Sequence, residues 1–182
     1  RPEQYRMVRQ LADPSAIEAA ADLIAGAELP IILSGTGVHT ARGHDGLEAL
    51  ANLLGCPVIP SWGGRGTLPD THPQVLHYSA PQANEAIAAA DVVLAVGTGI
   101  GEPLHYGSES HWSVGRADRK WIYVERDPGN IGVNRPIDIP LIGNLVDILP
   151  QLRDALIRRG PFNGYPRTGD WRRSFEEARE AL

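Results

Sequence analysis

Two turns of the type Gly-x-Gly in this sequence could contact a ligand. Each turn directly follows a short apolar run, the first at 31–33 and the second at 92–96. Apolar runs without polar alternation are typical of parallel strands buried on both faces. Ligands bind outside the carboxyl ends of such strands, where phosphate oxygens can approach backbone N–H groups. The four glycines are Gly35, Gly37, Gly97 and Gly99. Neither turn forms the full Gly-x-Gly-x-x-Gly fingerprint, so a turn that needs no ligand remains the alternative.

Three charged residues could join the glycines in a site that binds a nucleotide. Glu125 ends an apolar run and Asp127 follows it, which would let either acid accept hydrogen bonds from a ribose. The alternative for Asp127 is an Asx turn with the Pro-Gly that follows. Arg65 lies between two glycines in the long loop 61–73, where it could meet a phosphate, backbone carbonyls or a neighbouring subunit. The candidate nucleotide-binding residues are therefore Gly35, Gly37, Arg65, Gly97, Gly99, Glu125 and Asp127.

The sequence offers no catalytic constellation and no metal-binding spacing. The six histidines are scattered, without a helical i, i+4 pair, at His39, His44, His72, His77, His105 and His111. The single cysteine, Cys56, lies in an apolar turn before a strand, which is typical of a small buried hydrophobic side chain. No Gly-x-Ser-x-Gly nucleophile turn is present. We predict that this chain alone contains no catalytic residue and no metal site.

The elements that position the glycines and acids are strands alternating with helices. We expect strands near 31–33, 57–60, 92–96, 121–125 and 137–142, and helices near 14–25, 40–54, 82–90 and 144–157. Long loops are expected at 61–73 and 97–115. This alternation predicts a Rossmann-like three-layer α/β/α fold with a five- or six-stranded parallel sheet.

Three segments are expected along the chain. Residues 1–13 read as a lead-in from a preceding domain, 14–159 as a central nucleotide-binding-like domain, and 160–182 as a linker and helix towards a following domain. The polar start and the charged helical end lead us to expect a domain excised from a longer protein.

Composition argues against two classes of partner. The net charge is −5 and no run of Lys or Arg suggests a surface for nucleic acid or anionic membranes. No apolar stretch approaches membrane-spanning length and no signal peptide opens the sequence. We therefore predict a cytoplasmic protein that binds neither nucleic acid nor membrane.

Several motifs in the right order resemble one enzyme family. The segment 64–73 is similar to its Gly-Lys-Gly-x-x-Pro-x-x-His-Pro loop, 88–97 to its Ala-Asp-x-x-Leu-x-x-Gly strand, and 122–128 to its Ile-x-Ile-Asp-x-Asp-Pro strand end. The segments 30–38, 47–57 and 142–144 resemble its first strand and turn, its second helix and the start of its last helix. The stretch from about 14 to 156 thus resembles the central domain of thiamine-diphosphate-dependent enzymes of the acetolactate synthase, oxalyl-CoA decarboxylase and benzoylformate decarboxylase group.

The resemblance implies an indirect role in a larger enzyme. Such a parent is a lyase or transferase that acts on a 2-oxo acid or acyl-CoA, with thiamine diphosphate and Mg²⁺ held by flanking pyrimidine- and diphosphate-binding domains rather than by this chain. It is expected to be a homodimer or tetramer. The central domain holds FAD, ADP or CoA in some members and is empty in others.

Departures from the flavin-binding members bear on the ligand. Those members have Gly-Ala-Arg-Phe-Asp after the central strand, whereas this chain has Gly-Thr-Gly-Ile-Gly at 97–101. They also have Met-x-Gly-x-His-Gly where this chain has 75–80. Two alternatives therefore stay open: a ligand-free domain for structure and subunit contacts, and another Rossmann-like NAD- or FAD-binding domain.

Overall fold

The protein folds around one parallel β-sheet. A computed structural model describes residues 10–101, 112 and 118–181. The sheet has five strands in the order β2-β1-β3-β4-β5, and every neighbouring pair is parallel. The strands are β1 (Pro30–Ser34), β2 (Val58–Pro60), β3 (Val92–Val96), β4 (Lys120–Glu125) and β5 (Ile139–Ile142). The expected fold class is confirmed, with five strands in the described part of the chain.

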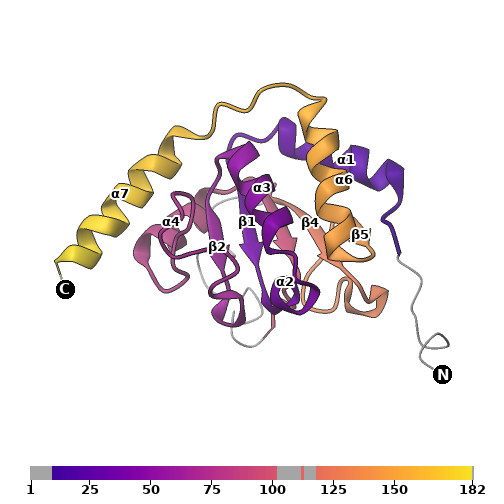
Figure 1. Ribbon diagram of the computed structural model, residues 1–182, viewed down its shortest axis with the longest axis horizontal. Helices are drawn as coiled ribbons and strands as arrows, with labels where there is room; N and C mark the ends of the chain where they lie inside the picture. Colours follow the sequence, from indigo (N-terminus) through magenta and orange to yellow (C-terminus); the bar gives the residue numbers. More distant parts are fainter. Residues whose placement is uncertain (1–9, 102–111, 113–117, 182) are drawn as a thin grey trace.

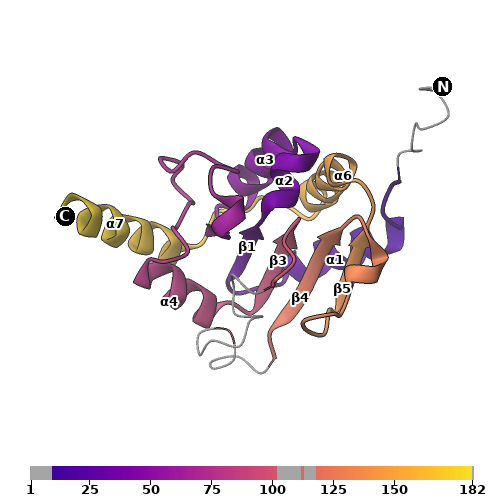
Figure 2. The same cartoon turned by 90° about the horizontal axis from the view of Figure 1, so that it is seen from below.

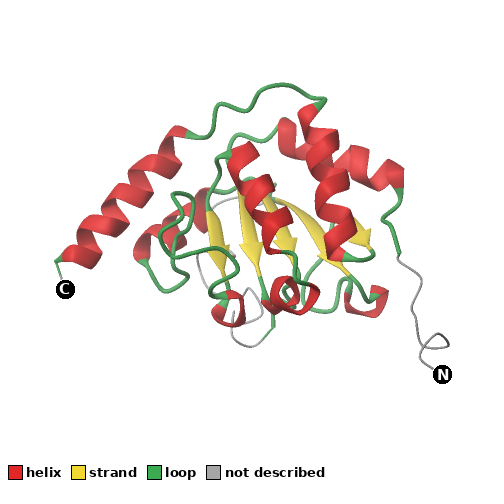
Figure 3. Ribbon diagram, in the orientation of Figure 1, coloured by secondary structure: helices red, strands yellow, loops and turns green. Residues whose placement is uncertain are grey.

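Helices cover both faces of the sheet, as Figures 1 and 3 show. One face carries α1 (Pro14–Ala25), α2 (Thr36–Ala41), α3 (His44–Leu54) and α6 (Leu145–Ile157). The other face carries α4 (Pro81–Ala89), and α7 (Pro166–Glu180) lies beside α4 in both views (Figures 1 and 2). None of the described helices combines the length and apolar character needed to cross a membrane.

Strand β3 lies at the centre of the sheet and its side chains alternate between the two layers. Val92, Leu94 and Val96 belong to the core under α1, α3 and α6. Val93 and Ala95 belong to the core under α4. All five residues are buried, because a central parallel strand is covered on both faces. This explains why its sequence is an uninterrupted apolar run.

The helix expected over 40–54 is in fact two helices. α2 ends at Ala41, Arg42 adopts the left-handed conformation with φ of 56°, and α3 begins at His44. Gly43, between the two helices, packs against α6, where an added Cβ would clash with Leu145 Cδ2. Beyond this turn α3 packs on α6. Of the loop expected at 97–115, residues 102–111 and 113–115 lie outside the described part.

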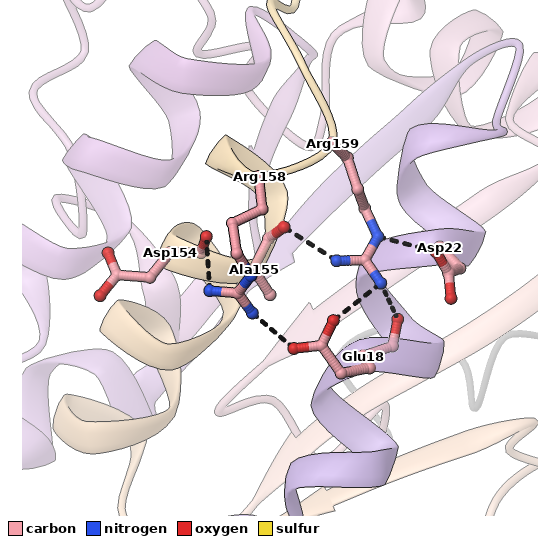
Figure 4. Close-up of polar contacts among 6 residues, drawn as sticks. All are labelled: Glu18, Asp22, Asp154, Ala155, Arg158 and Arg159. Atoms are coloured by element: carbon pink, nitrogen blue, oxygen red, sulfur yellow. Dashed lines mark hydrogen bonds and ion pairs between the residues drawn. The ribbon is translucent and has the colours of Figure 1, made fainter.

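An ion-pair cluster joins the two ends of the domain where α1 meets the end of α6 (Figure 4). Arg159 Nε donates to Asp22 Oδ1 at 2.7 Å, and its Nη2 lies 2.9 Å from Glu18 Oε2. Arg158 also contacts Glu18 and donates to the carbonyl of Asp154 at 3.1 Å. These bonds lower the pKa of both acids, and the hydrogen bonds from Arg159 contribute most. The cluster links α1 to the end of α6.

The terminal helix α7 packs against the domain through its first turns. Trp171 and Arg172 are buried, and Trp171 Nε1 donates to Glu85 on α4 at 3.2 Å. Arg172 donates to the carbonyls of Val75 at 2.7 Å and Asp70 at 3.1 Å. Beyond Phe175 the described residues of the helix are exposed. The expected segment boundaries near 13 and 159 remain predictions.

Candidate functional site

A cavity of about 470 Å³ opens at the carboxyl ends of the strands. It lies between α2, the ends of β3 and β4, and the beginning of α6, on the side of the sheet that α1, α3 and α6 cover. In the sheet β2 lies on one side of β1 and β3 lies on the other. The strand order therefore reverses between β1 and β3. Ligands of open α/β sheets bind at such a switch point. The residues that line it are Gly37, Thr40, Ala41, Gly97, Gly99, Val124, Glu125, Arg126, Asn130, Gly143, Asn144, Leu145 and Val146.

The glycines of the two Gly-x-Gly turns pack against each other. A Cβ on Gly35 would lie 2.4 Å from the carbonyl oxygen of Gly97, and one on Gly37 would lie 2.7 Å from Gly97 Cα. The Gly35 N–H donates to Val96 O at 3.0 Å and the Gly37 N–H to Gly97 O at 2.8 Å. These N–H groups are therefore not available to a phosphate. Gly97 has φ of 59°, a conformation that favours glycine.

Gly99 differs from the other three glycines. It lines the cavity, and an added Cβ would meet no atom within 4 Å. Its carbonyl accepts a hydrogen bond from Asn134 Nδ2 at 2.9 Å. Gly35, in contrast, does not line the cavity, because it is buried in the contact between the two turns.

Glu125 places its carboxylate at the cavity from the end of β4. Its Oε1 accepts hydrogen bonds from its neighbours' backbone, at 2.7 Å from Arg126 N and 3.1 Å from Asp127 N. The nearby Tyr123 hydroxyl is buried, and burial raises the pKa of Tyr123, with a further contribution from the charge and hydrogen bond of Glu125. Tyr123 therefore stays a neutral partner of this carboxylate.

The other two charged candidates lie outside the cavity lining. The Asp127 side chain accepts from Gly129 N at 2.9 Å and so caps the short 3₁₀ turn η4 (Pro128–Asn130). Arg65 is exposed on its loop and pairs with Asp70, with 3.1 Å between Nη2 and Oδ2. The structure thus brings together Gly37, Gly97, Gly99 and Glu125, and leaves Gly35, Arg65 and Asp127 beside them.

The start of α6 supplies polar groups that sequence reasoning did not single out. Asn144 occupies the N-cap position, yet its side chain makes no capping hydrogen bond and the residue lines the cavity. Among the described residues, the N–H groups of Leu145 and Val146 have no acceptor. Free N–H groups at a helix start attract anions, because the helix dipole adds a partial positive charge. A Gly-Asn pair directly before an amphipathic helix was the available sequence signal.

The described residues bring together no group of three or more His, Cys, Asp or Glu side chains that could hold a metal ion. Cys56 is buried, and burial raises the pKa of its thiol to about 12. The thiol therefore stays protonated at neutral pH and lacks the thiolate that nucleophilic chemistry requires.

Comparisons with known proteins agree with this geometry. The family model described as "Thiamine pyrophosphate enzyme, central domain" matches residues 17–152. The chain is 33% identical to the acetolactate synthase of Mycobacterium leprae over 159 residues, which are 85% of this chain and 25% of that protein. It is 34% identical to the 2-hydroxyacyl-CoA lyase of Arabidopsis thaliana over 149 residues, 81% of this chain and 24% of that protein.

A third relative matches a similar share of this chain. The chain is 33% identical to the probable acetolactate synthase large subunit of Methanocaldococcus jannaschii over 148 residues, 79% of this chain and 24% of that protein. The chain thus spans about a quarter of the length of the relatives that it matches. The match covers the whole sheet, from α1 to α6. With its parallel sheet and strand-end cavity, this chain belongs to the family of thiamine pyrophosphate enzyme central domains.

Proposed function

We propose that this domain binds an adenine nucleotide, with ADP as the best candidate, in the cavity at the strand ends. The observation that carries the proposal is the cavity itself, since Gly37, Gly97, Gly99 and Glu125 from three different strand ends line one space of about 470 Å³. Cavities of about 300–1,000 Å³ are typical of small-molecule sites. The parent is proposed to be a thiamine-diphosphate-dependent lyase or transferase that acts on a 2-oxo acid or acyl-CoA.

Polar groups at two sides of the cavity support one orientation of the nucleotide, with its ribose near Glu125 and its diphosphate near the start of α6. Glu125 at the end of β4 is placed to accept hydrogen bonds from ribose hydroxyls. The free N–H groups of Leu145 and Val146 and the side chain of Asn144 suit the diphosphate. Arg126 also lines the cavity and adds a positive charge. ADP is favoured over FAD because the arginine of the flavin-binding motif is replaced within the sequence 97–101.

In the whole protein this domain is proposed to position its neighbours rather than to react. Thiamine diphosphate supplies the electron sink for carbon–carbon bond cleavage in such enzymes. We propose that it binds with Mg²⁺ between the flanking pyrimidine- and diphosphate-binding domains of a homodimer or tetramer. On this proposal the chain alone is inactive.

A ligand-free structural domain is the second candidate. One observation favours it: Gly35, Gly37 and Gly97 are required by the close contact between the two turns, so these glycines need no ligand to account for them. The two candidates differ in whether anything occupies the cavity.

The test is nucleotide binding by the purified chain, followed by thermal shift and calorimetry with ADP, FAD and CoA. ADP is expected to raise the melting temperature with concentration, because a ligand that binds only the folded state stabilises it. Gly99→Val should abolish the shift, since Gly99 lines the cavity and an added Cβ would meet no protein atom within 4 Å. Gly101→Val is the matched control, because Gly101 also has free space but does not line the cavity.

Glu125→Gln refines the test, because it keeps the side-chain shape and removes the charge. We expect its affinity for ADP to fall about tenfold or more, as for loss of a charged hydrogen bond worth about 1.5–3 kcal/mol. A wild-type protein whose melting temperature responds to none of the three ligands would reject the nucleotide site and leave the structural domain.

A further inference from the structure

Two histidines that the sequence places five residues apart meet at the break between α2 and α3. His39 Nδ1 and His44 Nε2 are 2.9 Å apart, and the centres of the rings are 5.1 Å apart with the planes inclined at 51°. The left-handed Arg42 between the two helices makes this approach possible, since a continuous helix would place residues i and i+5 on different faces. Both rings are half-buried, so one edge of the pair faces solvent.

The other nitrogen of His39 is held by the backbone. His39 Nε2 lies 3.0 Å from the carbonyl oxygen of Arg65, which can only accept a hydrogen bond. The proton of neutral His39 is therefore on Nε2, and Nδ1 presents its lone pair to His44. Histidines that bind metals nearly always donate their second N–H to a carbonyl or carboxylate in this way.

We propose that His39 and His44 together bind one divalent transition-metal ion, and that Cu²⁺ and Ni²⁺ fit best. Metal–nitrogen bonds of about 2.0–2.1 Å that meet at a right angle place the two nitrogens about 2.9 Å apart. A tetrahedral ion with the same bond lengths needs about 3.3 Å between them. The observed 2.9 Å is that of a hydrogen bond between the rings, and a square or tetragonal ion such as Cu²⁺ or Ni²⁺ needs the same separation of the two nitrogens.

Binding replaces the hydrogen bond between the rings by two metal–nitrogen bonds. The Nε2–H of neutral His44 donates to His39 Nδ1 in the metal-free pair. On binding, this proton exchanges through solvent to Nδ1 of the same ring, so Nε2 offers a lone pair to the ion and no net proton is released. The ion lies beside the line between the nitrogens, so each ring rotates to aim its lone pair at it. The exposed edge of the pair gives room for this rotation and for water on the remaining coordination positions. His39 keeps its hydrogen bond to Arg65 O throughout.

This site is separate from the nucleotide cavity. α2 contributes Gly37, Thr40 and Ala41 to the cavity lining, whereas neither histidine lines it. Metal binding and nucleotide binding can therefore be measured independently, and the failure of one leaves the other standing. No metal site was predicted from the sequence, because the histidines are scattered along the chain without a helical i, i+4 pair.

The test is titration of the chain without a histidine tag with CuCl₂ or NiCl₂ at about pH 8, where free imidazole is neutral. Calorimetry should detect one site that His44→Gln and His39→Gln each weaken by more than about tenfold, since removal of even an outer-shell partner costs about 10–100-fold. His77→Gln is the matched control, because His77 bonds Ser79 at 2.9 Å and is not part of the pair. It should bind as the wild type does.

Electron paramagnetic resonance of the Cu²⁺ complex gives an independent readout. The wild type and His77→Gln should show coupling to two imidazole nitrogens, and His44→Gln should show coupling to one or none. Circular dichroism of the metal-free variants checks that they are folded, and His44 is a suitable site because it is half-exposed in the first turn of α3. Unchanged affinity and an unchanged spectrum in folded His44→Gln would overturn the proposal.

Discussion

Replacement of Gly35 by alanine tests whether the two Gly-x-Gly turns are structural. The new Cβ would lie 2.4 Å from Gly97 O, 2.5 Å from Thr98 Cβ and 2.6 Å from Thr98 Cα. Ordinary contacts between such atoms are about 3.5–4.0 Å, so the ends of β1 and β3 must separate by about 1 Å. Two of the three contacts are backbone atoms, which cannot rotate away.

The cost can be estimated from the terms involved. Overpacking of a buried site typically costs about 1–3 kcal/mol, and the rigid neighbours place this site at the upper end. Separation of the strand ends also strains the 3.0 Å bond from Gly35 N to Val96 O, a bond worth about 1 kcal/mol. The backbone of Gly35 is extended, with φ of −129°, so alanine gains about 0.4–1 kcal/mol from the unfolded chain. We expect a net loss of about 3 kcal/mol.

Equilibrium unfolding in urea measures this loss. With a slope of about 1–3 kcal/mol per molar urea, the midpoint should fall by about 1 M or more. Gly99→Ala is the control, because its Cβ meets no atom within 4 Å, and its stability should stay within about 0.5 kcal/mol of the wild type. Equal midpoints for the Gly35→Ala and Gly99→Ala proteins would refute the argument that packing requires Gly35.

Three further predictions concern buried polar groups. Arg172→Met should lower the unfolding free energy by about 2–3 kcal/mol, because it leaves the carbonyls that Arg172 binds without a donor, whereas exposed Arg173→Met should be nearly neutral in the same urea assay. Cys56, whose buried thiol has a pKa raised to about 12, should resist Ellman's reagent in the native protein and react only on unfolding; rapid native-state reaction would contradict its burial. Burial lowers the pKa of His72, so stability should be full above the ordinary histidine pKa and decline as pH falls below it, and His72→Gln should flatten this decline in melting curves measured against pH.

The strands could be predicted because their signal is local. A strand covered on both faces must be apolar throughout, and the predicted bounds 92–96 of β3 are those observed. The last strand is shorter than expected, beginning at Ile139 rather than 137. The alternation of strands and helices then determined the parallel sheet, since parallel strands need crossover connections.

The break between α2 and α3 could not be predicted from the neighbouring residues. Gly43 packs against Leu145, about a hundred positions further along the chain, and no local pattern reveals that contact. Arg42 has no sequence feature that demands a left-handed conformation, which non-glycine residues adopt only where the surrounding structure enforces it. The same break creates the histidine pair, so the metal site was hidden from sequence reasoning for the same reason.

For Asp127 and Arg65, contacts with nearby residues were the alternative to contact with a ligand. The Asx turn at Asp127 was the alternative to a ribose contact, and its side chain does accept the bond from Gly129. Arg65 pairs with Asp70, five residues away, on an exposed loop. The segment 142–144 was expected only as the start of the last helix, whereas the side chain of Asn144 makes no cap bond and the residue lines the cavity.

The two interpretations of the strand-end glycines are linked by geometry. When β1 and β3 are adjacent and their following segments diverge, the turns must pass each other at backbone contact, which only glycine permits at 35 and 37. That same divergence leaves a space beside the turns, because the segments move apart beyond the contact. The glycines therefore predict where a cavity opens but not whether it is filled. What can distinguish a filled cavity is the set of groups that packing does not use, here the Asn144 side chain and the free N–H groups of Leu145 and Val146.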